Sequence, residues 1–217
     1  MGSFTIAAMS KDRAKNIKVI LFDVDGVLTD GTIWLFPAPA GAKQSQKALM
    51  DAAADAGGYS VSGESTVEAK GFHAHDGTAI SLARLGGLKV GFVTKRISET
   101  VALRARDLKI DHIHQGMADK VEALEKVIAI EGIGPEEVAF VGDDVIDLPI
   151  MRRCGLAIAV PNAREEVKKE AHFITEHKGG EGAGRDAVEY VLKAQGKLEE
   201  AINAYIESRP AAQKSFK

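Results

Sequence analysis

The sequence has little of several features that would place it in a specialised class of protein. Among its 217 residues there is one cysteine, so an internal disulfide is impossible and a reducing cytoplasmic location is expected. The net charge of −3 leaves no basic excess, which argues against nucleic acid as a partner. No run approaches the roughly 18 apolar residues of a membrane helix, and the first residues lack the apolar centre of a signal peptide. We therefore expect a cytoplasmic protein that binds neither membranes nor nucleic acid.

The sequence does contain a regular alternation of short apolar runs and helical segments. The first run, Ile17–Phe22, is almost continuously apolar, as expected of a strand buried on both faces of a parallel sheet. The alternation predicts an α/β fold with a doubly wound, Rossmann-like parallel sheet. Further strands are expected at Leu88–Val93, Val138–Val141, Leu156–Val160 and His172–Thr175, and helices at Thr78–Leu85, Ser98–Leu108, Lys120–Ile130, Leu148–Arg153 and Arg164–Ala171.

One region interrupts this alternation. Residues 37–66 are rich in Ala, Gly and Ser, a composition that buries little. We expect them to form the long insert of a β-hairpin at 32–72, inserted after the first strand, with no large cap domain. The expected organisation is one α/β domain at 17–195, with an N-terminal extension at 1–16 and a helical C-terminal tail at 196–217.

The strongest chemical signal follows the first apolar run. Asp23 and Asp25, in the stretch DVDGVLTD, are two residues apart and would project from the same face of an extended chain. Gly26 then allows a sharp turn at the carboxyl edge of the sheet, where α/β folds bind ligands. One carboxylate of such a pair can attack while the other donates a proton to a leaving group. Turn-forming aspartates are the structural alternative, and they explain one aspartate better than three within eight residues.

A second acidic cluster follows the strand expected at 138–141. In the stretch GDDVID, Asp143, Asp144 and Asp147 would meet the first pair at the same edge of the sheet. Carboxylates that converge in this way need a cation between them, and an oxygen-only site with few protein ligands suits Mg²⁺. Asp144 or Asp147 could instead cap a helix, and for Asp147 capping and a direct role both remain open.

Two residues at a strand end and a helix start complete the pattern. Thr94 ends the apolar run LKVGFVT, and its hydroxyl can donate to a phosphoryl oxygen. Lys120 begins a helix, where its ammonium can neutralise developing charge. Phosphoryl transfer depends mainly on positioning and charge stabilisation of this kind. Alone, each residue would be an ordinary threonine or lysine, but their order with the two aspartate clusters favours a phosphoryl-transfer site.

The stretch DVDGVLTD, then Thr94, Lys120 and the stretch GDDVID, follow one another along the chain. With this order of motifs the sequence resembles the haloacid dehalogenase superfamily over nearly its whole length. The resemblance implies that Asp23 accepts the phosphoryl group as an aspartyl phosphate and that Asp25 acts as acid and base. Thr94 and Lys120 would assist catalysis. Mg²⁺ would be held by Asp23, by the backbone carbonyl of Asp25 and by Asp143.

A narrower resemblance is carried by the stretches DGTAI, GMADK, GDDVIDLPIMRRCGLAIAV and GGEGAGRDAVEYVLKAQGKLEEA. They are similar to the capless phosphatases that act on 3-deoxy-D-manno-octulosonate 8-phosphate in lipopolysaccharide synthesis. The resemblance implies a small phosphorylated sugar acid as substrate and a homo-oligomer, most simply a tetramer. The implied substrate contacts are His73, His75, Asp76, Gly77, Arg96, Arg104 and Lys120.

Departures from the family pattern keep other hypotheses open. His75 replaces the usual arginine, Lys95 follows the threonine in place of glycine, and Glu181 interrupts the glycine-rich stretch. A phosphatase for a different sugar phosphate is therefore an alternative, and His73 and His75 could be exposed strand-end histidines. A receiver-type signalling domain is another alternative, which Asp25 disfavours because receivers lack a second carboxylate two residues after the acceptor. A relative that has lost catalysis and serves as a binding partner is the third.

Overall fold

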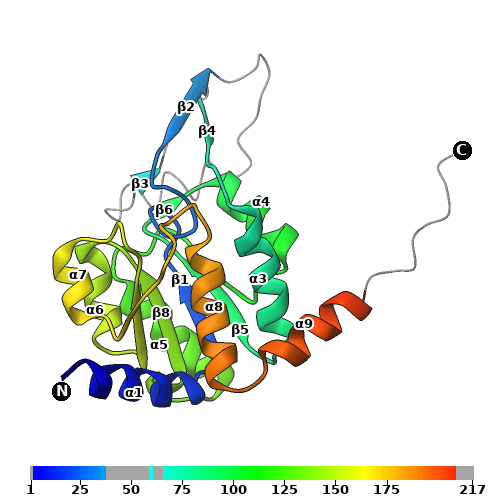
Figure 1. Ribbon diagram of the computed structural model, residues 1–217. Coiled ribbons are helices and arrows are strands. Elements are labelled where there is room, and N and C mark those ends of the chain that lie inside the picture. The colour runs from blue at the N-terminus through cyan, green and yellow to red at the C-terminus, as the bar shows by residue number, and fades with distance from the viewer. Residues whose placement is uncertain (1, 38–58, 61–65, 209–217) are drawn as a thin grey trace, which may run out of the picture.

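The structure is a computed structural model that describes residues 2–37, 59–60 and 66–208. Its centre is a six-stranded sheet in the order β10-β9-β8-β1-β5-β7, in which every neighbouring pair is parallel (Figure 1). The predicted α/β class and the parallel sheet are confirmed. The strands are β1 (Val19–Phe22), β5 (Lys89–Val93), β7 (His112–His114), β8 (Val138–Gly142), β9 (Leu156–Ala159) and β10 (Phe173–Ile174).

The central strands are buried on both faces, as their continuous apolar runs predicted. Every residue of β1, β8 and β9 is buried, because apolar side chains occupy both faces of these strands. The register places Phe22 opposite Phe92 on one side and opposite Val141 on the other. The strands β1, β5 and β8 therefore end within one residue of the same level, and the residues that follow them leave the sheet at one edge.

Two groups of helices cover the sheet. Helices α3, α8 and α9 contact one another and α8 also contacts α1, while α6 contacts both α5 and α7. Ser98 and Asp119 are the N-caps of α4 and α5, since each side chain accepts a backbone N–H of the first turn. No helix in the described part of the chain is long and apolar enough to cross a membrane. The helices are α1 (Gly2–Lys15), α3 (Ala74–Leu85), α4 (Glu99–Leu108), α5 (Lys120–Glu131), α6 (Leu148–Met151), α7 (Glu165–Glu170), α8 (Ala183–Ala194) and α9 (Leu198–Glu207), with short 3₁₀ turns at Pro135–Glu137 and Val145–Asp147.

The segment at 1–16 contains a helix that packs on the domain. Ala14 of α1 is fully buried, and the Tyr190 hydroxyl of α8 donates to Ser10 Oγ at 2.7 Å. Gln195 Nε2 donates to the carbonyl of Ala14 and to that of Ile17, at 3.2 and 2.7 Å. These hydrogen bonds join the end of α1 to the end of α8. The contact lies at the amino edge of the sheet, opposite the edge at which Asp23 follows β1 (Figure 1).

A β-hairpin follows β1 and projects from the body of the domain (Figure 1). Strand β2 (Trp34–Pro37) pairs antiparallel with β4 (Thr66–Ala69), which confirms the predicted hairpin. Most of the insert at 37–66 lies outside the described residues. Within it the structure describes β3 (Tyr59–Ser60), which pairs in parallel with β6 (Arg96–Ile97), two residues after the predicted site residue Thr94. No cap domain is present among the residues that the structure describes.

Candidate active site

Four of the predicted residues meet at the carboxyl edge of the sheet. Asp23 follows β1, Thr94 follows β5 and Asp143 follows β8, so the common level of these strand ends brings the three side chains together. Asp25 lies two residues after Asp23, on the same loop. A cavity of about 290 Å³ opens there, and its walls are formed by Asp23, Asp25, Thr94, Lys95, Arg96, Asp143, Asp144 and Ile146.

A buried lysine holds two of the carboxylates. The Nζ atom of Lys120, at the start of α5, lies 2.8 Å from Asp23 Oδ1 and 2.6 Å from Asp147 Oδ1. The second oxygen of Asp147 accepts the backbone N–H of Asp143 at 2.9 Å and of Asp144 at 3.2 Å. Asp147 is fully buried. The N-cap of the 3₁₀ turn is Asp144, whose side chain accepts the N–H of Val145, and Asp147 is the third residue of that turn. At the N-cap position of α6 the Asp147 side chain makes no capping hydrogen bond, so the capping interpretation holds for Asp144 and not for Asp147.

Carboxylates outnumber the cations that face them in this site. Burial, opposed by the Lys120 ammonium and assisted by Asp147, raises the pKa of Asp23 to about 7. Burial and the charges of Asp23 and Asp147 raise the pKa of Asp143 to about 8. Burial alone would lower the pKa of Lys120, but Asp23 and Asp147 outweigh it and raise that pKa. One lysine thus faces three carboxylates, and a further cation would neutralise the remainder.

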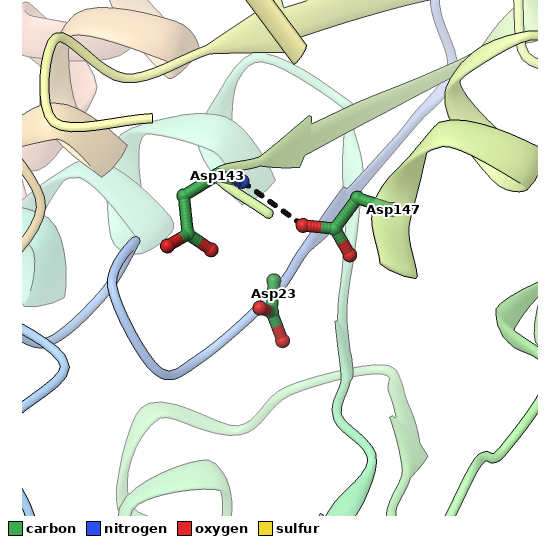
Figure 2. A group of neighbouring side chains, drawn as sticks. All are labelled: Asp23, Asp143 and Asp147. Atoms are coloured by element: carbon green, nitrogen blue, oxygen red, sulfur yellow. Dashed lines mark hydrogen bonds between the residues drawn. The ribbon is translucent and has the colours of Figure 1, made fainter. Parts of the chain in front are cut away.

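The geometry fits a divalent cation. One ligand atom from each of Asp23, Asp143 and Asp147 lies within 4.8 Å of the other two (Figure 2). Asp143 Oδ1 is buried with no hydrogen-bond partner, so it is available as a ligand. Both oxygens of Asp147 already accept hydrogen bonds from protein donors. Asp23 and Asp143 are therefore the better direct ligands, and Asp147 supports them from behind.

A glycine makes the approach of the two aspartate loops possible. Gly26 has a φ of +92°, and a Cβ atom on it would lie 2.2 Å from Asp143 Oδ2. Asn162 Nδ2 donates to the Gly26 carbonyl at 2.8 Å, and Asn162 Oδ1 accepts the N–H of Gly179 at 2.8 Å. Asn162 thus joins the loop that contains Asp23 and Gly26 to the glycine-rich segment at 179–184. Sequence reasoning missed Asn162, because a lone asparagine after a strand carries no distinctive pattern.

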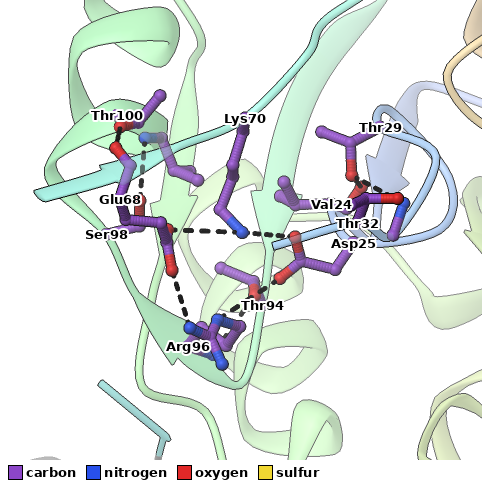
Figure 3. Close-up of polar contacts among 12 residues, drawn as sticks. Val24, Asp25, Thr29, Thr32, Glu68, Lys70, Thr94, Arg96, Ser98 and Thr100 are labelled. Carbon is purple, nitrogen blue, oxygen red and sulfur yellow. Dashed lines mark hydrogen bonds and ion pairs between the residues drawn. The ribbon is translucent and has the colours of Figure 1, made fainter. Parts of the chain in front are cut away.

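The Asp25 side chain forms ion pairs with two cations, Lys70 and Arg96. Its Oδ1 lies 2.5 Å from Lys70 Nζ, and its Oδ2 lies 3.8 Å from Arg96 Nε (Figure 3). Lys70 and its neighbour Glu68 were not predicted as site residues. Both come from the end of the hairpin, where Lys70 lies 45 residues along the chain from Asp25. No local pattern distinguishes the two from solvent-facing charges.

Several predicted substrate contacts lie outside this cavity within one chain. His73, His75, Asp76, Gly77 and Arg104 gather at the start of α3, which begins four residues before the predicted Thr78. The first turn of α3 is held by a tertiary contact, because Asp76 Oδ1 accepts the backbone N–H of Arg185 at 2.9 Å. Burial raises the pKa of Asp76 to about 6. Of the predicted substrate contacts, Arg96 lines the cavity. Lys120 is not among the residues that line it, but its Nζ atom forms an ion pair with Asp23, which does.

Known proteins share this architecture over almost the whole chain. A family model described as haloacid dehalogenase-like hydrolase matches residues 93–185. The 3-deoxy-D-manno-octulosonate 8-phosphate phosphatase of Yersinia pestis is 34% identical over 194 residues, which cover 89% of each chain. Its crystal structure has a TM-score of 0.72 at 33% identity and covers 88% of this chain and 89% of that one. The Moraxella catarrhalis phosphatase of the same name, solved with magnesium, phosphate and KDO, has a TM-score of 0.73 at 32% identity and covers 90% and 97%.

These matches define the class to which the fold and the aspartate site belong, the haloacid dehalogenase-like hydrolases. Within that superfamily the chain belongs to the family that contains the 3-deoxy-D-manno-octulosonate 8-phosphate phosphatases. It is a phosphatase, a hydrolase of phosphoric monoesters. The receiver-type alternative is therefore wrong.

Replacement of Gly26 by alanine should weaken metal binding. A Cβ atom there must displace Asp143, and the positive φ adds backbone strain of about 1–2 kcal/mol. Gly87→Ala is the matched control, because Gly87 has a φ of +80° but no atom within 4 Å of its Cβ position. Both variants should melt earlier. Calorimetric titration with Mg²⁺ should show at least a roughly tenfold weaker Kd for Gly26→Ala alone, and equal Kd values would contradict the proposed contact.

The metal-free chain should lose stability as the pH rises. Since the pKa values of Asp23 and Asp143 are raised to about 7 and about 8, the folded chain retains protons that the unfolded chain has released. The free energy of unfolding therefore falls between about pH 4 and pH 8 and then levels off. Mg²⁺ binds the ionised carboxylates and removes this penalty. Thermal melts should show a larger Mg²⁺-induced rise in Tm at pH 8 than at pH 6, and a smaller rise at pH 8 would contradict this site.

Proposed function

We propose that this phosphatase is Mg²⁺-dependent and hydrolyses a small phosphorylated sugar acid, with 3-deoxy-D-manno-octulosonate 8-phosphate as the substrate, through an aspartyl phosphate on Asp23. The observation that carries the chemistry is the position of Asp23, held by Lys120 at the wall of a cavity that also contains Asp143 and Thr94. The substrate is supported by the names of the relatives that match this chain over nearly their full length.

In the proposed reaction a carboxylate oxygen of Asp23 attacks phosphorus in line with the leaving oxygen. The bond from phosphorus to the leaving oxygen breaks, and Asp25 donates a proton to that oxygen. Water then attacks the aspartyl phosphate, Asp25 takes a proton from it, and release of inorganic phosphate restores Asp23. Thr94 donates a hydrogen bond to a phosphoryl oxygen, and Lys120 neutralises charge on Asp23.

Asp23, Asp143 and the backbone carbonyl of Asp25 would hold Mg²⁺. When bound, the ion supplies charge neutralisation and alignment of the phosphoryl group. The orphaned Asp143 Oδ1 is the atom of the site that supports this assignment most directly.

The same proposal includes a homo-oligomer, most simply a tetramer. Strand β2 and the residue before it expose four successive apolar side chains, Ile33, Trp34, Leu35 and Phe36, each at least 41% accessible. Such a row on a projecting hairpin is a surface that soluble monomers usually avoid. A tetramer whose hairpins cover one another would bury this row.

Asp23→Asn should abolish turnover, because an amide cannot form the acyl phosphate. Asp25→Asn should slow turnover by roughly 10²–10⁴-fold, the usual loss for a general acid and base. Asp12→Asn, on the exposed face of α1, is the control and should keep the wild-type rate. Phosphate release at saturating Mg²⁺ measures all three, with phosphorylated sugar acids compared against neutral sugar phosphates. Turnover by Asp23→Asn near the wild-type rate would refute the covalent mechanism, and a preference for neutral sugars would refute the substrate class.

Substitution of the exposed apolar row should dissociate the oligomer. Trp34→Ser with Phe36→Ser removes two large side chains from the hairpin without touching the core. Ile130→Ser is the matched control, because Ile130 is 69% exposed but lies at the end of α5, far along the chain from the hairpin. Light scattering should show a smaller mass for the double variant alone. A wild-type monomer at the same concentration would contradict the proposed assembly.

A further inference from the structure

A lysine at the end of the hairpin contacts Asp25, and no step of the proposed reaction uses this lysine. Lys70 directly follows β4, and its side chain is fully buried. Lysine is almost never fully buried without partners, because its charge must be compensated once water is removed. Lys70 Nζ has two such partners, Asp25 Oδ1 at 2.5 Å and Glu68 Oε1 at 3.3 Å. Its position at the proposed acid and base calls for a functional explanation.

The lysine belongs to a closed set of alternating charges (Figure 3). Glu68 Oε2 accepts from Arg96 Nη2 at 2.6 Å, and Arg96 Nε lies 3.8 Å from the free oxygen of Asp25. Asp25, Lys70, Glu68 and Arg96 therefore form a ring in which each charge lies between two of opposite sign. Glu68 and Lys70 come from the hairpin, Asp25 from the loop after β1, and Arg96 from β6.

Glu68 is the fixed anion of this ring. Its side chain is 8% exposed, and burial would raise its pKa, but hydrogen bonds from Ser98 and Arg96 and the charges of Lys70 and Arg96 outweigh burial and lower it. The Thr100 hydroxyl donates to the Glu68 backbone carbonyl at 3.0 Å. The end of β4 is thereby fastened to the start of α4, and the hairpin base cannot shift without breaking these contacts.

A proton donor must be held within hydrogen-bond reach of the atom that it protonates. A free aspartate side chain samples several rotamers, and each misplacement costs rate. The charge-assisted bond from Lys70 engages Oδ1 of Asp25, while Oδ2 lies 3.8 Å from Arg96 Nε. The Asp25 side chain lines the cavity and is 20% exposed.

We propose that Lys70 and Glu68 are positioning residues for Asp25. Lys70 fixes the orientation of the Asp25 carboxylate, and Glu68 holds Lys70 and Arg96 in place around it. The inference deepens the proposed function and rests on it, because it requires Asp25 to protonate the leaving group. It assigns to the hairpin a part in the chemistry of its own subunit, in addition to any part in assembly.

The test compares two leaving groups. Departure of an alkyl alcohol needs a proton from Asp25, whereas p-nitrophenolate leaves without one. Lys70→Met keeps the length of the side chain and removes its charge and its donors. We expect kcat/KM for an alkyl phosphate, such as the phosphorylated sugar acid, to fall about 10²-fold, at the lower end of the loss of a general acid. The value for p-nitrophenyl phosphate should change by less than about threefold.

Two further variants and a control complete the experiment. Lys70→Arg keeps a charged donor and should recover part of the loss on the alkyl phosphate. Glu68→Gln keeps the shape but removes the central anion, and it should show the same selective loss with a raised KM, since Arg96 is no longer held. Lys89→Met removes an exposed ion pair with Asp111 at the far end of β5, and both substrates should react as in the wild type.

The outcomes separate the inference from the proposed function. Equal losses on both substrates, or no loss on either, in a Lys70→Met variant that melts as the wild type would overturn the positioning role and leave a purely structural one. If Lys70→Met does not fold, the same comparison with Glu68→Gln decides. The proposed function fails on other grounds, namely a wild-type chain without Mg²⁺-dependent phosphatase activity or an active Asp23→Asn variant.

Discussion

The ion pair of Lys120 with two buried carboxylates is the interaction on which the site depends. It joins the end of β1, through Asp23, to the turn after β8, through Asp147, and to the start of α5. Without the ammonium, three carboxylates at one sheet edge would repel one another in a region of low dielectric. Because Asp147 also accepts the N–H groups of Asp143 and Asp144, the position of the lysine determines where the Asp143 loop lies.

The lysine compensates only part of the charge, and this shortfall gives the site its chemistry. Burial keeps the pKa of Asp23 and of Asp143 well above the ordinary value when no cation is bound. A site fully neutralised by protein groups would have no affinity for a divalent cation and no carboxylate free to attack. The metal-free fold is therefore less stable than one with an uncharged core at this position. Functional sites commonly carry a cost of this kind, because their chemistry requires groups that are unfavourable to bury.

The sequence predicted what depends on local pattern and on the topology of parallel sheets. Continuous apolar runs marked β1 and β8, and because parallel strands share an edge, the residues after them were expected to meet, as Asp23 and Asp143 do. Strand β7 was not predicted, since its three residues, His-Ile-His, contain no apolar run. The early start of α3 was missed because a contact from Arg185, distant in sequence, holds its first turn. Glu68, Lys70 and Asn162 could not be predicted for the same reason, since their partners lie far along the chain and their neighbours in sequence resemble ordinary surface segments.

The hairpin has an exposed apolar surface on one strand and buried charged residues at the end of the other. Its outward strand exposes an apolar row, while the end of its return strand carries buried charges into the ring around Asp25. In the proposed assembly, packing of the first surface would fix the second, because both belong to one short antiparallel pair. Of the positions that depart from the family pattern, Lys95 lines the cavity that contains the aspartates, whereas His75 and Glu181 lie outside it. Changes at such positions can alter which sugar is accepted without disturbing Asp23, Lys120 or the metal ligands, so the reaction can be retained while the substrate diverges.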